Sequence, residues 1–171
     1  KATEVCETLK KVCRVKLDGS EQSPGWKFAE YEMKGVPVRL EIGPKDIENN
    51  QCVLVRRDNR EKIFVSLDNL EQSIQKTLDI YAKAIFDKAL ANVEKRTYAC
   101  TDINEIAGLL DANGDGFVKA MWCGDEECED KVKELTGVGS RCIPFEQENL
   151  SDTCVCCGKP AKHMVVWGRQ Y

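Results

Sequence analysis

The sequence predicts an α/β protein in two parts, a mixed-sheet domain over residues 1–95 followed by a small α+β unit over residues 96–171. Three observations support this prediction. Apolar residues that alternate with polar ones indicate several short strands. An apolar repeat of three and four residues after residue 68 indicates a long helix. Cysteine and glycine become frequent after residue 96, and the expected elements become shorter.

The elements of the first part follow from local patterns taken in order along the chain. An amphipathic helix opens the sequence, and turn signals at Ser23–Gly25 and Gly43–Asp46 separate the next segments. Asp68 and Glu71 have the spacing of a capping box at the start of the long helix. The expected elements are a half-buried strand at 15–17, a helix at 26–34, strands at 36–42, 52–55 and 63–65, and a helix from 68 to about 95.

The second part is expected to need a cross-link for its stability. Strands are predicted at 117–121 and around His163–Val166. A unit of this size buries too small a fraction of its surface to be comfortably stable, and small units commonly use a metal or disulfides.

Composition limits the classes of function. The 171 residues are 42% apolar and 32% charged, as in soluble globular proteins, and the start lacks a signal peptide. No apolar run approaches the ~20 residues that cross a bilayer. We therefore expect a cytosolic protein, and the start at Lys1 inside a helical pattern suggests a truncated chain. The net charge of −4 argues against indiscriminate nucleic-acid binding but permits selective reading of a few exposed bases.

Six of the ten cysteines lie between Cys123 and Cys157, and in a cytosolic chain such crowding favours a metal. Two close pairs supply four thiolates, the usual ligand set of a closed structural zinc site. The predicted ligands are Cys123, Cys128, Cys154 and Cys157. Reduced buried thiols are the alternative, and a redox role for Cys154, Cys156 and Cys157 is another.

Other motifs fail on inspection. Asp111–Gly116 copies the start of a calcium-binding EF-hand loop, but Trp122 stands where a bidentate carboxylate is required. The only histidine, His163, is expected to be a packing or surface residue. Because phosphate-binding loops, nucleophile elbows and acid–base constellations are all missing from the sequence, we expect no self-contained active site.

A long stretch, Ser23–Asp46, closely resembles the anticodon-binding domain of class II prolyl-tRNA synthetases of the archaeal and eukaryotic type. The stretches Trp122–Glu129, Arg141–Phe145 and Cys154–Pro160 are similar to the C-terminal zinc domain of that family. The resemblance implies a catalytic domain upstream that binds ATP, magnesium and proline, a homodimeric parent, and a sheet that lacks its first strand. A free-standing RNA-binding regulatory module without ligase activity is the alternative.

The resemblance also implies a set of contacts to the anticodon of tRNA(Pro). Proline anticodons carry guanine at the second and third positions. A carboxylate accepts hydrogen bonds from the guanine N1 and N2 donors, whereas Arg or Lys donates to O6 and N7. Arg56 and Arg57 are expected to touch phosphates, and the carboxylate of Tyr171 is expected to point toward the catalytic domain. The anticodon-contacting residues would be Glu32, Arg39, Lys45, Asp46 and Lys62.

Overall fold

The computed structural model describes residues 1–170, apart from the side chain of Asn113. The chain divides into two compact units, Lys1–Lys88 and Ala89–Tyr171. Helix α4 (Leu70–Lys95) runs across this division. The functional boundary expected between residues 95 and 96 stays a prediction.

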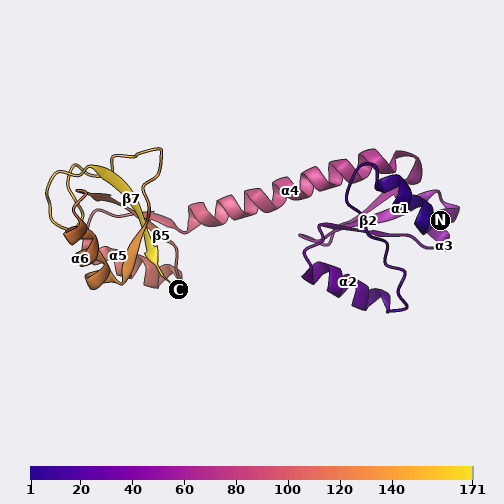
Figure 1. The fold of residues 1–171 in the computed structure, drawn as a ribbon, viewed down its shortest axis with the longest axis horizontal. Helices are drawn as coiled ribbons and strands as arrows, with labels where there is room; N and C mark the ends of the chain where they lie inside the picture. Colours follow the sequence, from indigo (N-terminus) through magenta and orange to yellow (C-terminus); the bar gives the residue numbers. More distant parts are fainter. Residues whose placement is uncertain (171) are drawn as a thin grey trace. The chain divides into compact units, whose positions relative to one another are not determined.

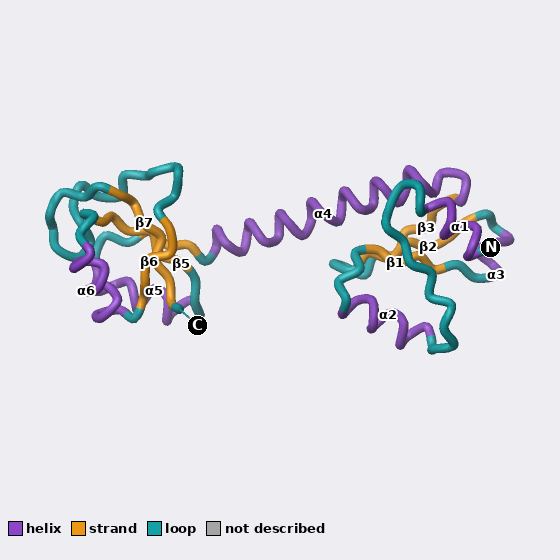
Figure 2. The backbone as a smooth tube through the Cα atoms, in the orientation of Figure 1, coloured by secondary structure: helices purple, strands orange, loops and turns teal. Residues whose placement is uncertain are grey.

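The first unit is built on a three-stranded antiparallel sheet in the order β1-β2-β3 (Figure 2). Pro37 directly precedes β1, which lies at the edge of this sheet, as a strand that begins next to a proline should. The elements before α4 are α1 (Ala2–Leu9), α2 (Pro24–Met33), β1 (Val38–Glu41), α3 (Pro44–Glu48), β2 (Gln51–Arg56), β3 (Lys62–Ser66) and the 3₁₀ turn η1 (Leu67–Asn69).

Helix α1 and the first turns of α4 cover one face of this sheet, and α2 lies on the other side (Figure 1). Val5 and Leu9 of α1 pack with Leu54 of β2 and with Leu70 and Ile74 of α4 in one buried cluster. Alternate residues of β1 and β3 point into the same cluster. The opposite face therefore presents the remaining residues of each strand.

The segment at residues 15–17 does not form the strand that its alternation predicts. Val15 and Leu17 line an apolar cavity of about 600 Å³ whose far wall includes Val38 and Leu40 of β1. This gap separates the segment from β1, so its backbone has no neighbouring strand with which to pair. A strand needs such a partner, and alternation alone does not supply one.

Two local predictions need correction. The expected turn at Gly43–Asp46 is the start of helix α3, because Pro44 occupies the first helical turn and Asp46 accepts a hydrogen bond from the N–H of Gly43. The long helix is entered through η1, where Ser66 Oγ accepts from the N–H of Asp68. Ser66, and not Asp68, therefore caps this end.

The second unit has a four-stranded sheet in the order β4-β5-β7-β6, in which β4 and β5 are parallel and the other pairs antiparallel. Trp167 is fully buried against α5 and α6. The predicted class, α/β with a mixed sheet and a small second unit, is confirmed. The elements are β4 (Thr97–Ala99), α5 (Ile103–Asn113), β5 (Phe117–Trp122), α6 (Glu126–Thr136), β6 (Val138–Cys142) and β7 (His163–Arg169).

The stretch that copies a calcium loop consists of the end of α5 and the connection from α5 to β5. Gly116 has a φ of +145°, and a Cβ at this position would lie 2.2 Å from the carbonyl oxygen of Arg96. Asp111 forms an ion pair with Arg169 at 2.5 Å. This stretch therefore serves strand packing. Across residues 1–170, none of the helices has both the length and the apolar character that crossing a bilayer requires.

Candidate functional site

Four charged side chains meet on the open face of the first sheet. Arg39 of β1 donates from Nη1 to Glu32 Oε1 of α2 at 2.9 Å and from Nε to Glu41 Oε1 at 2.7 Å. Lys62 Nζ of β3 lies 3.9 Å from Glu41 Oε2. We call Glu32, Arg39, Glu41 and Lys62 the charge network.

The strand register explains why these residues meet. Arg39 and Lys62 both lie opposite Val55 of β2, so they share one face of the sheet. The guanidinium carbon of Arg39 lies 3.9 Å from the ring centroid of Phe28, four residues before Glu32 on α2. The Arg39 and Glu32 side chains keep 23% and 28% exposure, so a ligand can reach both.

Lys45 and Asp46 lie apart from this network, on α3. The Asp46 carboxylate caps that helix by accepting from the N–H of Gly43 at 2.9 Å. Lys45 is exposed, and among the described residues its side chain has no ion-pair partner. The structure thus brings together Glu32, Arg39 and Lys62 of the five predicted residues, with Lys45 and Asp46 just beyond the end of β1.

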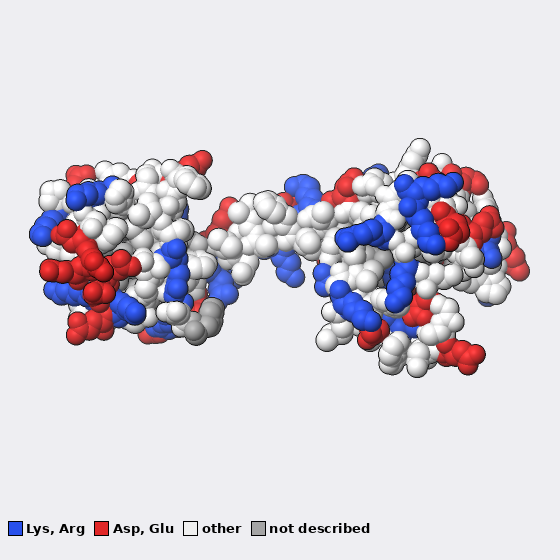
Figure 3. Space-filling model, in the orientation of Figure 1, with Lys and Arg blue, Asp and Glu red and all other residues white. Residues whose placement is uncertain are grey.

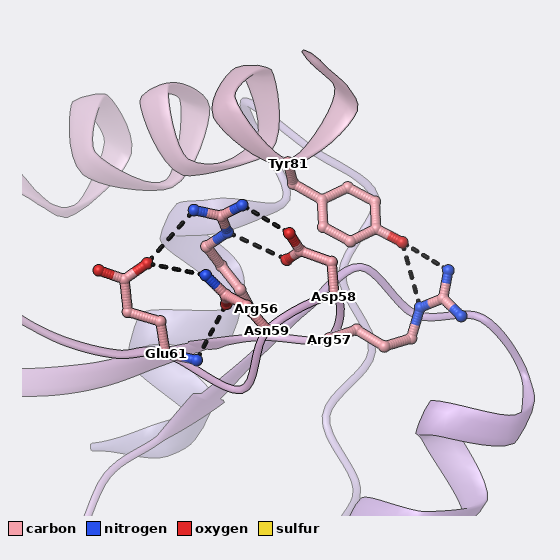
Figure 4. Close-up of polar contacts among 6 residues, drawn as sticks. All are labelled: Arg56, Arg57, Asp58, Asn59, Glu61 and Tyr81. Carbon is pink, nitrogen blue, oxygen red and sulfur yellow. Dashed lines mark hydrogen bonds and ion pairs between the residues drawn. The ribbon is translucent and has the colours of Figure 1, made fainter. Parts of the chain in front are cut away.

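Arg56 and Arg57 have different surroundings (Figure 4). Arg56 is buried and its guanidinium is occupied by Asp58, at 2.6 and 3.1 Å, and by Glu61 at 3.3 Å. Arg57 donates to Tyr81 Oη of α4 at 2.5 and 3.1 Å, and it borders a small hollow shared with Glu32 and Arg39. Of the two predicted phosphate contacts, only Arg57 is available to a ligand.

Sequence reasoning missed three members of this site. Glu41 has the appearance of an ordinary surface partner of Arg39, yet it also faces Lys62. Arg60 reaches Glu32 Oε2 at 3.3 Å from a hairpin position with φ of +59°. Phe28 could have been found from the sequence, because its spacing of four from Glu32 places both residues on one face of α2.

The four predicted zinc ligands converge in the second unit. The sulfur atoms of Cys123, Cys128, Cys154 and Cys157 all lie within 4.8 Å of one another. Cys123 follows β5 and Cys128 lies in the first turn of α6, while the other two come from the turn before β7. The first three are buried and Cys157 is exposed.

Backbone hydrogen bonds hold the two cysteine pairs in place. The N–H of Lys162 donates to the Trp122 carbonyl at 2.8 Å, and the N–H of Cys154 donates to the Lys159 carbonyl at 2.8 Å. Lys159 also forms an ion pair with Asp125 at 3.1 Å, which joins the two turns. Gly124 and Gly158 have φ of +92° and +72°, so each turn includes a conformation that glycine adopts most readily.

The donor set fits a tetrahedral metal. Bonds of about 2.3 Å from zinc to sulfur place the sulfurs of a tetrahedron about 3.8 Å apart, and Cys157 Sγ lies 3.8 Å from Cys123 Sγ. Burial raises the pKa of the Cys123 and Cys128 thiols. The N–H of Lys159 lowers the pKa of the Cys157 thiol to about 7. A dication would stabilise the thiolate form of all four.

The remaining candidates lie outside this cluster or outside the described part of the chain. Cys142 is exposed on β6, and Cys156 packs against the cluster without joining the four sulfurs. The His163 ring is paired with Trp122 at a centroid distance of 6.4 Å. Tyr171 lies outside the described residues.

The two units differ in surface charge. In the view of Figure 3, acidic side chains gather over α6 in the second unit, whereas lysine and arginine are prominent on the first. The sequence of α6 begins with Glu126, Glu127 and Glu129. A polyanionic partner is therefore better matched by the first unit than by the α6 surface.

Two family models match the chain. The model described as an anticodon binding domain matches residues 1–77, and the model of the C-terminal part of prolyl-tRNA synthetase matches residues 103–171. The chain therefore matches an anticodon-binding domain followed by the C-terminal domain of prolyl-tRNA synthetases.

Curated relatives and a solved structure agree with these two matches. Proline–tRNA ligases of Clostridium botulinum (strain Okra) and Ruminiclostridium cellulolyticum are 58% identical over all 171 residues. A crystal structure of prolyl-tRNA synthetase from Cryptosporidium parvum, in complex with L-proline and AMP, matches 99% of this chain with a TM-score of 0.89 and 34% identity. The chain spans 36% of the length of each of these synthetases.

Proposed function

We propose that this chain is the tRNA-reading and supporting C-terminal portion of a proline–tRNA ligase. Its parent would attach proline to tRNA(Pro) in a two-step, ATP-dependent reaction in the cytoplasm, as a homodimer. ATP and magnesium would bind to the catalytic portion, outside these 171 residues, and this portion alone would be inactive. The matches to the two domain models and the relatives named proline–tRNA ligases support the proposal.

The charge network is the observation that carries the role of this portion. It presents carboxylates and a guanidinium side by side, and guanine offers both donors and acceptors along its edges. Glu32 would accept from guanine N1 and N2, while Arg39 would donate to O6 and N7. Packing on Phe28 and the two carboxylates fix Arg39 before the RNA arrives, which lowers the ordering cost of binding.

The other predicted residues would surround this centre. Lys62, 60% exposed at its side chain, and Arg57 can neutralise phosphates near the network. Lys45 and Asp46 would contact a neighbouring nucleotide from α3.

The cysteine cluster would hold a structural zinc. Cys123, Cys128, Cys154 and Cys157 would be its ligands, and four thiolates leave no open position for a water or substrate. The metal would supply a cross-link between the turn after β5 and the turn before β7. It would take no part in chemistry on the tRNA.

Binding of the 171-residue chain to transcripts that differ only in the anticodon tests the proposal. We expect tRNA(Pro) to bind more tightly than transcripts in which the second or third anticodon guanine is replaced. Arg39→Ala should weaken the cognate complex by about 1–3 kcal/mol, or roughly 5- to 150-fold in Kd, and should relax discrimination at one guanine.

Lys83→Ala is the matched control, because it also removes one positive charge but lies on α4, where Lys83 pairs only with Asp87 among the described residues. Its Kd for tRNA(Pro) should stay close to that of the wild type at the same salt concentration. Equal binding of all anticodon variants by the wild-type chain would reject the anticodon role and would favour a general RNA-binding module.

A further inference from the structure

An aromatic ring lies exposed on the same sheet face as the charge network. Phe64 of β3 is 64% exposed, although it lies in the middle of a strand. Its neighbours Ile63 and Val65 point to the opposite face and join the core. Phe64 therefore contributes little to the packing of its own unit.

The register places Phe64 next to the network. Phe64 lies opposite Val53 of β2, and Val53 lies opposite Glu41 of β1. Two residues away along each strand, Lys62, Val55 and Arg39 form the neighbouring row on the same face. Two interstrand steps of about 4.8 Å separate the backbones of Phe64 and Glu41. Neighbouring nucleotides of one RNA loop can therefore reach both.

Burial distinguishes Phe64 from the rest of this face. Val53 and Val55 of the central strand are 7% and 2% exposed, whereas the ring of Phe64 remains open at the edge strand. The side chain of Lys62, two residues away, crosses β2 toward Glu41. A single exposed phenylalanine is unremarkable on a protein surface, but this one shares its face of the sheet with Lys62 and Glu41 of the charge network.

Single-stranded RNA bases are recognised in two ways at once. Their edges form hydrogen bonds with polar side chains, and their faces stack on aromatic rings. Stacking tolerates any base, because every base has a π-face. The charge network supplies the first kind of contact, and within the described residues Phe64 is the exposed ring next to its Lys62–Glu41 side.

We infer that Phe64 is the stacking platform for an anticodon-loop base adjacent to the guanine that the charge network reads. This inference rests on the proposed function. Phe64 would add affinity without selecting the base, and Lys62 would neutralise the phosphate between the two nucleotides. The partner is single-stranded RNA in a tRNA loop.

Three substitutions separate stacking from simple apolar contact. Phe64→Leu keeps an apolar side chain but removes the flat ring, whereas Phe64→Tyr and Phe64→Trp keep a ring. We expect Phe64→Leu to weaken binding of tRNA(Pro) by about 5- to 150-fold, and the aromatic variants to bind within about threefold of the wild type. The ratio of cognate to altered-anticodon Kd should stay unchanged in Phe64→Leu.

The control is Phe86→Leu, because Phe86 is 65% exposed and therefore matches Phe64, but lies on α4. It should bind tRNA(Pro) as the wild type does. In Phe64→Trp, tRNA should quench the added indole fluorescence beyond the change seen in the wild-type chain, whose own tryptophans supply the background.

Each outcome decides between the two proposals. Wild-type binding by Phe64→Leu, together with a loss in Arg39→Ala, overturns the stacking role and leaves the anticodon role standing. Equal losses in Phe64→Leu and Phe86→Leu also overturn it, since they indicate a general apolar effect. Wild-type binding by both Arg39→Ala and Phe64→Leu removes both proposals.

Discussion

The charge network and the cysteine cluster are both assemblies of four polar side chains drawn from different elements, but they differ in what they leave open. In the network, Arg39 and its carboxylates stay about a quarter exposed. In the cluster, three of the four thiols are buried, and backbone hydrogen bonds fix the turns around them. Side chains that read a base must be able to exchange their hydrogen bonds within the protein for hydrogen bonds to the RNA. Metal ligands that stabilise a small unit must instead keep the same bonds throughout.

The largest effect is expected from loss of the metal cross-link in the cysteine cluster. Cys128→Ser removes one thiolate, and structural zinc contributes about 10–16 kcal/mol to small metal domains. We expect the second unit to lose roughly 3 kcal/mol or more, which lowers its Tm by more than about 10 °C. Hydrogen exchange of the amides in β5 and β7 measures this loss, with the first unit as an internal reference.

Cys142→Ser is the control for this substitution, because Cys142 is exposed and lies outside the four sulfurs. Elemental analysis should find one zinc per chain, and a chelator should reproduce the effect of Cys128→Ser. If a metal-free chain melts like the metal-bound one, the cluster is a set of reduced thiols and the comparison with the network loses its basis.

A smaller loss of stability is expected from breaking the ion pairs of the β2–β3 hairpin. Arg56→Leu leaves the largely buried carboxylate of Asp58 without its partner and should destabilise the first unit by about 1–3 kcal/mol. Urea unfolding followed in the first unit measures the change. Arg60→Leu in the same hairpin should stay within about 0.5 kcal/mol, because the Arg60 side chain is 77% exposed. Equal effects would show that burial does not decide stability here.

The smallest expected effect is a loss of stability at low pH, when Asp18 becomes protonated. The side chain of Ser20 and its N–H, which donates to Asp18 Oδ1 at 2.9 Å, lower the pKa of Asp18 to about 2. An unfolded aspartate has a pKa of about 3.9. The folded-state contribution is therefore complete above about pH 4 and is lost as the pH falls through 2. The NMR shift of the Ser20 amide should follow this titration, and Asp18→Asn should abolish it.

Spacing in the sequence was sufficient to select the four clustered cysteines, because two short turns each bring a pair of sulfurs together. The charge network and the residues beside it were harder to predict. Glu32, Arg39 and Lys62 came from the family resemblance, whereas Arg60 depends on a left-handed hairpin residue and Phe64 on the register of β2 with β3. The prediction of a strand at 15–17 was wrong for a related reason. Strand pairing depends on distant parts of the chain, and the local alternation of apolar and polar residues carries no information about them.

Gly116 has a consequence for anyone redesigning this chain. The residue that gives Asp111–Gly116 its calcium-loop appearance is required because the Arg96 carbonyl lies where a side chain would begin. Mutagenesis that samples this connection should therefore find position 116 intolerant even of alanine, regardless of whether calcium is supplied. A conserved glycine here would record steric crowding between two chain segments, and a motif search would mistake it for a ligand-binding signature.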